Sequence, residues 1–432
     1  MKWKGVILVS IISSFITACS PFQKIQLNKH FDFEENLHHH HTGFALYDLE
    51  EKKHLYQHNA NRYFTPASNT KIFTLYASLL SLGDSIPALQ YHIKGDSLIF
   101  WGTGDPSLLN PNVHTNSRVL NFLKNNDYNL YFSSDNYYDT HFGPGWAWDD
   151  YEFSYSTERS PMPIYGNLIE VSKSAENTTI DVNVPYFKRY FLLEDSISNT
   201  RSIVRNIDDN LLYYYPNRPQ FNYTIPFHYS DFLLTQLLSD TIQKPVNLIH
   251  YQKNKTEKTL YSVPSDSIYK VMMQMSDNFL AEQLLLLCSN SIGDSLRASL
   301  AIENIKEKYL FNLPDEPVWR DGSGLSRYNL FTPRSIVSLW EKIYYEAGKD
   351  RLFSLISVGG KAGTIKNYYK ADPPYIYGKT GTLSNHHSLS GFLIAKSGKI
   401  LVFSYMNNNY PVSSSEIKPA MEKLLWEIHE KY

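Results

Sequence analysis

The chain has 432 residues, of which 42% are hydrophobic and 15% aromatic, and its formal net charge is −2. A near-neutral chain without a basic stripe argues against nucleic-acid binding, and this apolar content argues against a disordered protein. The length allows two domains, each with a sizeable core.

The first 19 residues are typical of a bacterial lipoprotein signal. Lys2 and Lys4 precede an apolar run over residues 5–16, which is too short to cross a bilayer comfortably. Small residues before Cys19 resemble a lipobox, which predicts cleavage before Cys19 and a lipid on it; an ordinary signal with a chance cysteine is the alternative. A lipid anchor would hold the protein to a membrane outside the cytoplasm, in the periplasm, and Ser20 leaves the outer membrane open as its destination.

Residues 20–41 are polar, lack clear periodicity and are interpreted as a linker. They end in four histidines at 38–41. Metal binding is the alternative role for these side chains, but adjacent histidines in a linker rarely converge on one ion. The second cysteine, Cys288, follows a run of leucines and is expected to be a buried apolar residue.

Two strands, at 43–48 and 53–56, are expected around an acidic turn. After Pro66, apolar residues recur at helical spacing up to residue 80. Ser68 and Lys71 therefore lie in the first turn of a helix, three residues apart and on one face.

Residues 88–262 have a different texture, because short strand-like runs such as 97–101 and 178–184 alternate with turn residues. This pattern indicates a β-rich inserted domain. Helical periodicity returns at 268–275 and 279–288, and a final helix is expected around 417–428.

Three more strands are expected at 375–382, 388–395 and 399–407. Strands at both ends of the chain imply that the two ends share one sheet. The expected organisation is therefore one domain formed by 42–87 and 263–432, interrupted by the insert.

Three short motifs carry the chemistry, in the order S-x-x-K, S-D-N and K-T-G. They are Ser68-Asn69-Thr70-Lys71, Ser276-Asp277-Asn278 and Lys379-Thr380-Gly381. This set is known from β-lactamases and penicillin-binding proteins. Each motif alone is weak, because S-x-x-K also begins at Ser267 and Ser415, and S-D-N also begins at Ser134.

Each motif also has a structural alternative. Ser68 could be a plain helix N-cap, as is expected of Ser267 and Ser415. Ser134 lies among turn residues, where a turn is expected. Ser276 and its neighbours separate two helices, where they could cap a helix and also face a cleft.

The K-T-G motif is expected on a strand edge. Lys379 would supply charge, Thr380 a hydroxyl and Gly381 room for close backbone approach, which suits a substrate with a free carboxylate docked like an extra strand. An edge lysine that discourages aggregation is the alternative.

Beyond these motifs, the chain resembles the class C low-molecular-mass penicillin-binding proteins, the D-alanyl-D-alanine carboxypeptidase/endopeptidase family, from about Gly43 to the last helix. Five further segments look typical of that family: 64–67, 102–108, 144–150, 279–282 and 321–327. The resemblance implies an α+β fold with a serine-transpeptidase/β-lactamase-like domain of antiparallel sheet and flanking helices, interrupted by a β-rich domain. The insert is expected to be shorter than in the family's larger members, and members are often simply secreted.

The resemblance also implies roles at the site. Ser68 would be the nucleophile, Lys71 the base and Ser276 a proton shuttle. Asn278, Lys379, Thr380 and Gly381 would bind substrate, and the backbone N–H groups of Ser68 and Thr382 would form the oxyanion hole. No metal or cofactor is implied.

The expected activity is hydrolysis of D-Ala-D-Ala bonds, and of cross-links, in peptidoglycan stem peptides through an acyl-enzyme, with β-lactam antibiotics as covalent inhibitors. A β-lactamase on the same site would need a deacylating group that the sequence does not reveal. A D-amino-acid amidase or esterase is a further alternative. A lipoprotein that only binds wall peptide is disfavoured, because a pure binder need not keep Ser68 and Lys71.

Overall fold

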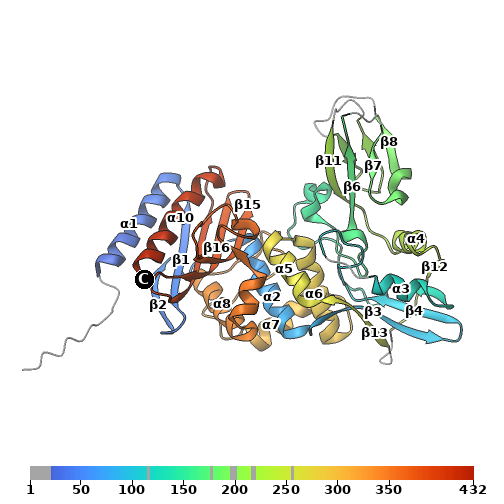
Figure 1. Ribbon diagram of the computed structural model, residues 1–432, viewed down its shortest axis with the longest axis horizontal. Coiled ribbons are helices and arrows are strands. Elements are labelled where there is room, and N and C mark those ends of the chain that lie inside the picture. The colour runs from blue at the N-terminus through green and yellow to red at the C-terminus, as the bar shows by residue number, and fades with distance from the viewer. Residues whose placement is uncertain (1–20, 114–116, 176–178, 195–201, 216–219, 254–256) are drawn as a thin grey trace, which may run out of the picture.

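The computed structural model describes residues 21–113, 117–175, 179–194, 202–215, 220–253 and 257–432. The molecule is elongated (Figure 1), with a sheet and two covering helices at one end, a group of helices in the middle and the inserted region at the other end. No helix in the described ranges is both long and apolar enough to cross a membrane. The expected signal and Cys19 lie outside the described residues.

The main sheet has six strands in the order β14-β15-β16-β17-β1-β2, all antiparallel. Their bounds are β14 Ser357–Val358, β15 Ile376–Leu383, β16 His386–Ile394, β17 Ile400–Asn408, β1 His41–Asp48 and β2 Lys53–His58. Strand β1 pairs directly with β17, with Phe44 opposite Tyr405. The prediction that the two ends of the chain share one sheet is therefore confirmed.

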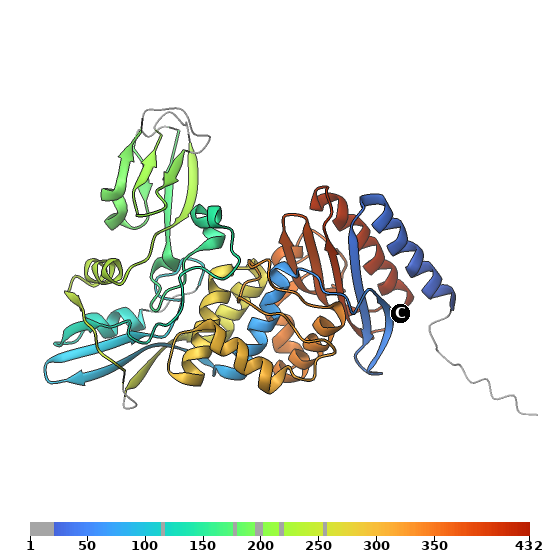
Figure 2. The same cartoon turned by 180° about the vertical axis from the view of Figure 1, so that it is seen from behind.

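Helices α1 (Pro21–His38) and α10 (Ser414–Lys431) lie side by side on one face of this sheet, as both views show (Figures 1 and 2). The expectation of a linker over 20–41 is wrong for the part that forms α1. Phe31 is fully buried among the rings of Phe44, Tyr56 and Tyr405. Because Leu27 and Phe31 are almost the whole apolar stripe of this helix, its periodicity is hard to see in the sequence.

The middle of the molecule is helical, and α6 lies at its centre. The helices are α2 Lys71–Ser81, α5 Ser265–Met275, α6 Asn278–Gly293, α7 Ala298–Tyr309, α8 Pro333–Ala347 and α9 Lys349–Leu355. Residues 279–290 of α6 are buried on every side, which suits a helix that is apolar nearly all round. Cys288 is buried there, as expected.

The inserted region leaves the middle along β3 (Ser85–Lys94) and returns along β13 (Lys258–Pro264), which pair antiparallel. The expected borders, 88 and 262, fall inside this pair. Around it lies a five-stranded sheet, β12-β5-β4-β3-β13, and two three-stranded sheets follow, β11-β6-β7 and β8-β10-β9. The region has a hydrophobic core of its own, separate from the two cores that flank the main sheet.

The remaining strands and α-helices of this region are mostly short, as expected for runs interrupted by turn residues, and α4 is the longest with 12 residues. They are β4 Ser97–Gly102, α3 Arg118–Lys124, β5 Asn129–Phe132, β6 Leu168–Lys173, β7 Asp181–Val182, β8 Phe191–Leu193, β9 Ile203–Arg205, β10 Leu212–Tyr214, β11 Phe221–Pro226, α4 Asp231–Ile242 and β12 Val246–Leu248. Of the strand expected at 178–184, β7 covers two residues, and position 178 lies outside the described part.

Candidate active site

The three motifs, more than 300 residues apart at their extremes, meet where the main sheet joins the helices. Ser68 lies in a short 3₁₀ turn, η1 (Ala67–Thr70), directly before α2. Ser276 and Asp277 separate α5 from α6, and Lys379 lies in the middle of β15. These elements gather at the centre of the molecule (Figure 1).

Ser68 is not a helix cap. Its hydroxyl accepts a hydrogen bond from Lys71 Nζ at 3.0 Å, and η1 has no side-chain cap. Ala67, directly before it, has a φ of +50°, a left-handed conformation that costs about 1 kcal/mol for a residue with a Cβ. The backbone is therefore bent sharply at the point where it presents the Ser68 hydroxyl.

The other copies of the motifs have local partners. The Ser267 hydroxyl donates to the Pro264 carbonyl at 2.5 Å, and the Ser415 hydroxyl donates to Ser413 Oγ at 2.8 Å. In the inserted region, the Ser134 hydroxyl donates to the Asp231 carboxylate.

Lys71 is fully buried, and its ammonium makes three hydrogen bonds. They reach Ser68 Oγ, Asn278 Oδ1 at 2.6 Å and the Ser323 carbonyl oxygen at 2.8 Å. Two of these partners can only accept, whereas Ser68 also has a proton to give. If the amine loses a proton, its lone pair is therefore directed toward the Ser68 O–H.

The surroundings of Lys71 favour loss of a proton from its ammonium group. Burial lowers the pKa of Lys71 to about 8, against the opposing charges of Asp321, Asp277 and Glu282. Lys71 can thus exist in part as a free amine near neutral pH, which a general base requires.

Ser276 has a φ of +60° and ends α5, and the Asp277 side chain caps α6 by accepting from Leu280 N. The predicted capping role therefore belongs to Asp277 and leaves the Ser276 hydroxyl directed at Lys379 Nζ, from which it accepts at 2.8 Å. Asn278 uses both ends of its amide, because Oδ1 accepts from Lys71 and Nδ2 donates to the Tyr155 carbonyl of the inserted region at 2.8 Å.

The Lys379 side chain is fully buried, whereas the β15 backbone from Lys379 onward lies at an edge of the sheet, because β14 pairs with this strand only at residues 377–378. Burial, and then the charge of Lys71, lower the pKa of Lys379 well below the usual value. Thr380 is partly exposed, and its hydroxyl donates to Thr364 Oγ1 at 2.7 Å.

Gly381 brings β15 against the segment that carries Ser68. A Cβ on Gly381 would lie 2.4 Å from the Pro66 carbonyl oxygen and 2.9 Å from Asn69 N, so only glycine fits. A hydrogen bond also joins the two segments, because Asn69 Nδ2 donates to the Lys379 carbonyl at 3.1 Å. The close approach predicted at this glycine thus includes the protein's own nucleophile segment.

A cleft of about 1100 Å³ opens beside these groups. Ser68, Asn278 and Thr382 line it, together with residues of the inserted region and of the loop at 324–328. The charged side chains on its wall are Asp149, Asp150 and Arg327. Among the described residues, no group of three or more His, Cys, Asp or Glu side chains could hold a metal ion.

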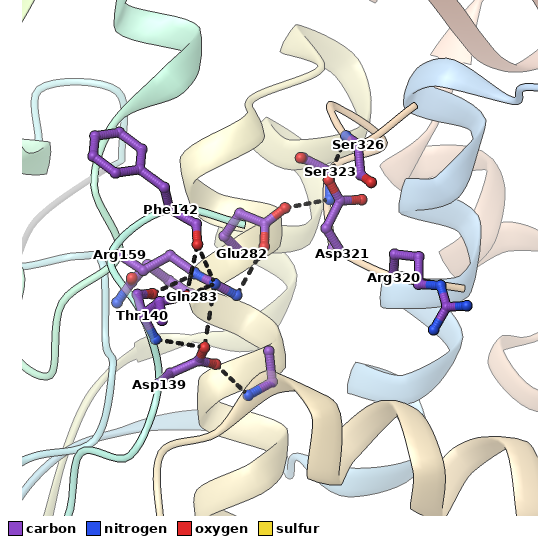
Figure 3. A network of polar contacts seen from close by, with 12 residues as sticks. Asp139, Thr140, Phe142, Arg159, Glu282, Gln283, Arg320, Asp321, Ser323 and Ser326 are labelled. Carbon is purple, nitrogen blue, oxygen red and sulfur yellow. Dashed lines mark hydrogen bonds and ion pairs between the residues drawn. The ribbon is translucent and has the colours of Figure 1, made fainter. Parts of the chain in front are cut away.

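Three participants were missed by the sequence analysis, although the resemblance had marked two of the segments that contain them. They are the carbonyls of Tyr155 and Ser323 and the buried carboxylate of Glu282, which accepts from Ser323 N at 2.7 Å (Figure 3). Glu282 lies four residues after Asn278 on the same helical face, which is a signal the sequence does contain. Backbone carbonyls carry no such signal.

The chain matches the D-Ala-D-Ala carboxypeptidase 3 (S13) family over residues 23–209 and 227–428. It belongs to this family. The D-alanyl-D-alanine carboxypeptidase DacB of Haemophilus influenzae is 24% identical over 429 residues, covering 87% of each chain. The D-alanyl-D-alanine carboxypeptidase of Actinomadura sp. strain R39 is 23% identical over 422 residues, covering 85% of this chain and 78% of the relative.

Among solved structures, penicillin-binding protein 4 of Haemophilus influenzae superimposes with a TM-score of 0.74 at 20% identity, covering 90% of this chain and 97% of the other. This likeness confirms the expected α+β, transpeptidase-like fold with an additional β-rich region. The resemblance to class C penicillin-binding proteins is confirmed too, and the chain is a serine-type D,D-peptidase by family.

Proposed function

We propose that this protein hydrolyses the D-Ala-D-Ala bond of peptidoglycan stem peptides through an acyl-enzyme on Ser68. The observation that carries the proposal is the buried amine of Lys71, whose three hydrogen bonds leave Ser68 as its one proton donor. The related carboxypeptidases support the choice of substrate.

In this mechanism Ser68 Oγ attacks the carbonyl carbon of the penultimate D-alanine and gives its proton to Lys71 Nζ. The backbone N–H groups of Ser68 and Thr382, both on the cleft wall, stabilise the oxyanion. The C–N bond then breaks, and the proton reaches the leaving nitrogen through Ser276. Water attacks the ester, releasing the shortened peptide and restoring the Ser68 hydroxyl.

Substrate binding is assigned to groups around this centre. Lys379 supplies a positive potential behind the strand, and Thr380 and Gly381 present the β15 backbone to the substrate's C-terminal carboxylate. Asn278 borders the cleft at Ser68 and would contact the peptide amide after exchanging its bond to Tyr155. The charges of Asp149, Asp150 and Arg327 suit a stem-peptide side chain that bears both an amine and a carboxylate.

A labelled penicillin tests the proposal. We expect one stable adduct, on the peptide that contains Ser68, found by mass spectrometry. Rapid turnover of the penicillin would instead indicate a β-lactamase, and absence of any adduct would indicate a non-catalytic binder.

Muropeptides then define the reaction. Loss of one alanine from pentapeptides identifies a carboxypeptidase, and conversion of cross-linked dimers to monomers identifies an endopeptidase. If penicillin acylates Ser68 but neither reaction occurs, a D-amino-acid amide or ester is the substrate.

We also propose that the mature protein is anchored outside the cytoplasm by a lipid on Cys19. The signal pattern before this cysteine supports the anchor. Replacing Cys19 by Ser should move the protein from the membrane to the soluble periplasmic fraction, whereas Cys288→Ser, at the buried cysteine, should not. Membrane retention of the Cys19 variant would contradict the anchor.

A further inference from the structure

We infer that Glu282 and Arg159 are positioning residues through which the inserted region holds the Ser323 carbonyl, and with it the Lys71 amine, in place. The inference rests on the proposed function, because it takes Lys71 as the base for Ser68. It adds two residues that lie outside the three motifs.

The first step is a chain of contacts from the inserted region to the base, of which Figure 3 shows the part from Arg159 to Ser323. Arg159 Nη1 lies 3.6 Å from Glu282 Oε2, Glu282 Oε1 accepts from Ser323 N at 2.7 Å, and the Ser323 carbonyl accepts from Lys71 Nζ at 2.8 Å. The Ser323 backbone thus makes two contacts: its N–H donates to the Glu282 carboxylate, and its carbonyl accepts from the Lys71 amine.

The second step is the anchoring of Arg159. Its guanidinium is 2% exposed and donates to the carbonyls of Thr140 and Phe142 at 3.2 and 3.1 Å. It also pairs with Asp139, whose other oxygen accepts from Ala298 N, the first residue of α7. Arg159 therefore ties a loop of the inserted region to two helices of the catalytic region.

The third step is the tight fit of the loop that contains Ser323. Gly324 has a φ of +83°, and a Cβ there would lie 1.9 Å from the Ala67 carbonyl oxygen, directly before Ser68. Asp321 accepts from Gly324 N and Ser326 N, and from the indole N–H of Trp146 in the inserted region. A shift of this loop would displace both Ser68 and Lys71.

Glu282 is more than a packing residue, because one of its oxygens, Oε2, is buried without a hydrogen bond and is served only by the longer ion pair. The charged groups that face it are Arg159 from the inserted region, Asp321 from the loop and Lys71 from α2. Burial and the charge of Asp321 raise the pKa of Glu282 to about 7. Its charge in turn raises the pKa of Lys71.

The test measures the rate at which benzylpenicillin acylates Ser68 between pH 5.5 and 9. In Glu282→Gln, loss of the negative charge should move the acidic limb of this profile to lower pH. The amide N–H₂ would also face Arg159, so we expect the plateau rate to fall on the order of 10-fold through misplacement of Ser323. KM for a D-Ala-D-Ala peptide should change little.

The matched control is Arg205→Met. Arg205 is an equally buried arginine of the inserted region, and its guanidinium donates to the carbonyls of Tyr151 and Asp209 in that same region. It should lower the Tm and leave the pH profile in place. A Glu282→Gln profile like that of the wild type, or a loss that merely follows Tm as in Arg205→Met, overturns the inference.

A second comparison covers the case in which Glu282→Gln does not fold. Arg159→Met leaves the buried carboxylate without its cation, so the double variant Arg159→Met/Glu282→Gln should have a higher Tm and acylation rate than Arg159→Met alone. A double variant no better than Arg159→Met overturns the inference. If the wild-type protein is not acylated at Ser68, the proposed function fails, and this inference fails with it.

Discussion

The catalytic and inserted regions bury charged side chains in different ways. Around the cleft, the buried Lys71 interacts electrostatically with both Glu282 and Lys379, and burial shifts the pKa of each of the three. In the inserted region, the buried Arg205 and Glu158 are held largely by backbone groups, including the Tyr151 carbonyl and Tyr229 N. The buried charges around the cleft act on the base, whereas those of Arg205 and Glu158 fix loops of the inserted region.

The largest expected effect on activity distinguishes Ser68 from Ser267 and Ser415, the serines that begin the other two S-x-x-K motifs. Ser68→Ala removes the nucleophile, so turnover of a D-Ala-D-Ala peptide should fall by about 10³-fold or more. Ser267→Ala and Ser415→Ala remove only local hydrogen bonds and should stay within about twofold of the wild type. Steady-state kinetics on the three variants checks this, and a penicillin adduct that survives Ser68→Ala would refute the assignment.

The two S-D-N copies, one in each region, give the next comparison. Ser276→Ala removes the hydroxyl that accepts from Lys379, and we expect kcat to fall by about 10²-fold or more, as is usual for loss of a proton-transfer group. Ser134→Ala loses a hydrogen bond to Asp231 and should affect Tm alone. Equal kcat for both variants would show that Ser276 transfers no proton.

The pH dependence should follow Lys71. The free amine is the active form, and the pKa of Lys71 is about 8, so the acylation rate should fall about 10-fold per pH unit well below pH 8. Burial also lowers this pKa from 10.5 in the unfolded chain, so the Lys71 contribution to the free energy of unfolding rises with pH between about 8 and 10.5. A rate profile that is flat from pH 5.5 to 8 would exclude Lys71 as the base.

A smaller effect is expected where the regions touch. Trp146→Phe removes the indole N–H that donates to Asp321 at 2.9 Å, a single hydrogen bond worth about 1 kcal/mol. We expect a several-fold slower acylation by penicillin. Trp148→Phe, at an indole that is 77% exposed two residues away, is the matched control and should acylate at the wild-type rate. Equal acylation rates in the two variants would show that the Trp146 hydrogen bond does not support the loop that contains Asp321.

Most of the fold and the members of the site were predictable from the sequence, for physical reasons. Strand and helix patterns located β1, β15–β17 and α10, because α10 turns one apolar stripe to a core and the central strands β16 and β17 are buried on both faces. The motifs named Ser68, Lys71, Ser276 and Lys379, because their chemistry lies in side chains. Helix α1 was missed because its apolar stripe is so short.

The contacts among these residues were less predictable. The burial of Lys379, the bond from Asn278 to Tyr155 and the place of Ser323 depend on backbone atoms and on segments far apart in the chain. Periodicity and motif spacing contain no information about such pairs. Glu282 could nevertheless have been predicted from the sequence. It lies four residues after Asn278, and an acidic residue in a largely apolar helix needs a buried partner.

The smallest effect concerns His228 in the inserted region, whose pH dependence should have the opposite sign to that of Lys71. Its Nδ1 lies 2.9 Å from the buried Glu158 carboxylate, and this hydrogen bond raises the pKa of His228 above 6.5. The stabilisation is fully present below pH 6.5 and is lost as the pH rises through the folded-state pKa. Because the ring is 42% exposed, solvent screening keeps the contribution below about 1 kcal/mol.

His228→Gln should therefore lower Tm at pH 6 but not at pH 8.5, without moving the acylation profile that follows Lys71. His250→Gln is the matched control, because His250 pairs with Asp135 at 3.1 Å but is 97% exposed, so its pair should contribute almost nothing. If His228→Gln also shifted the acidic limb of acylation, the two regions would be electrostatically coupled, and the contrast drawn between their buried charges would be wrong. If Tm alone responds, the inserted region adds its own pH dependence to folding and leaves the chemistry to Lys71.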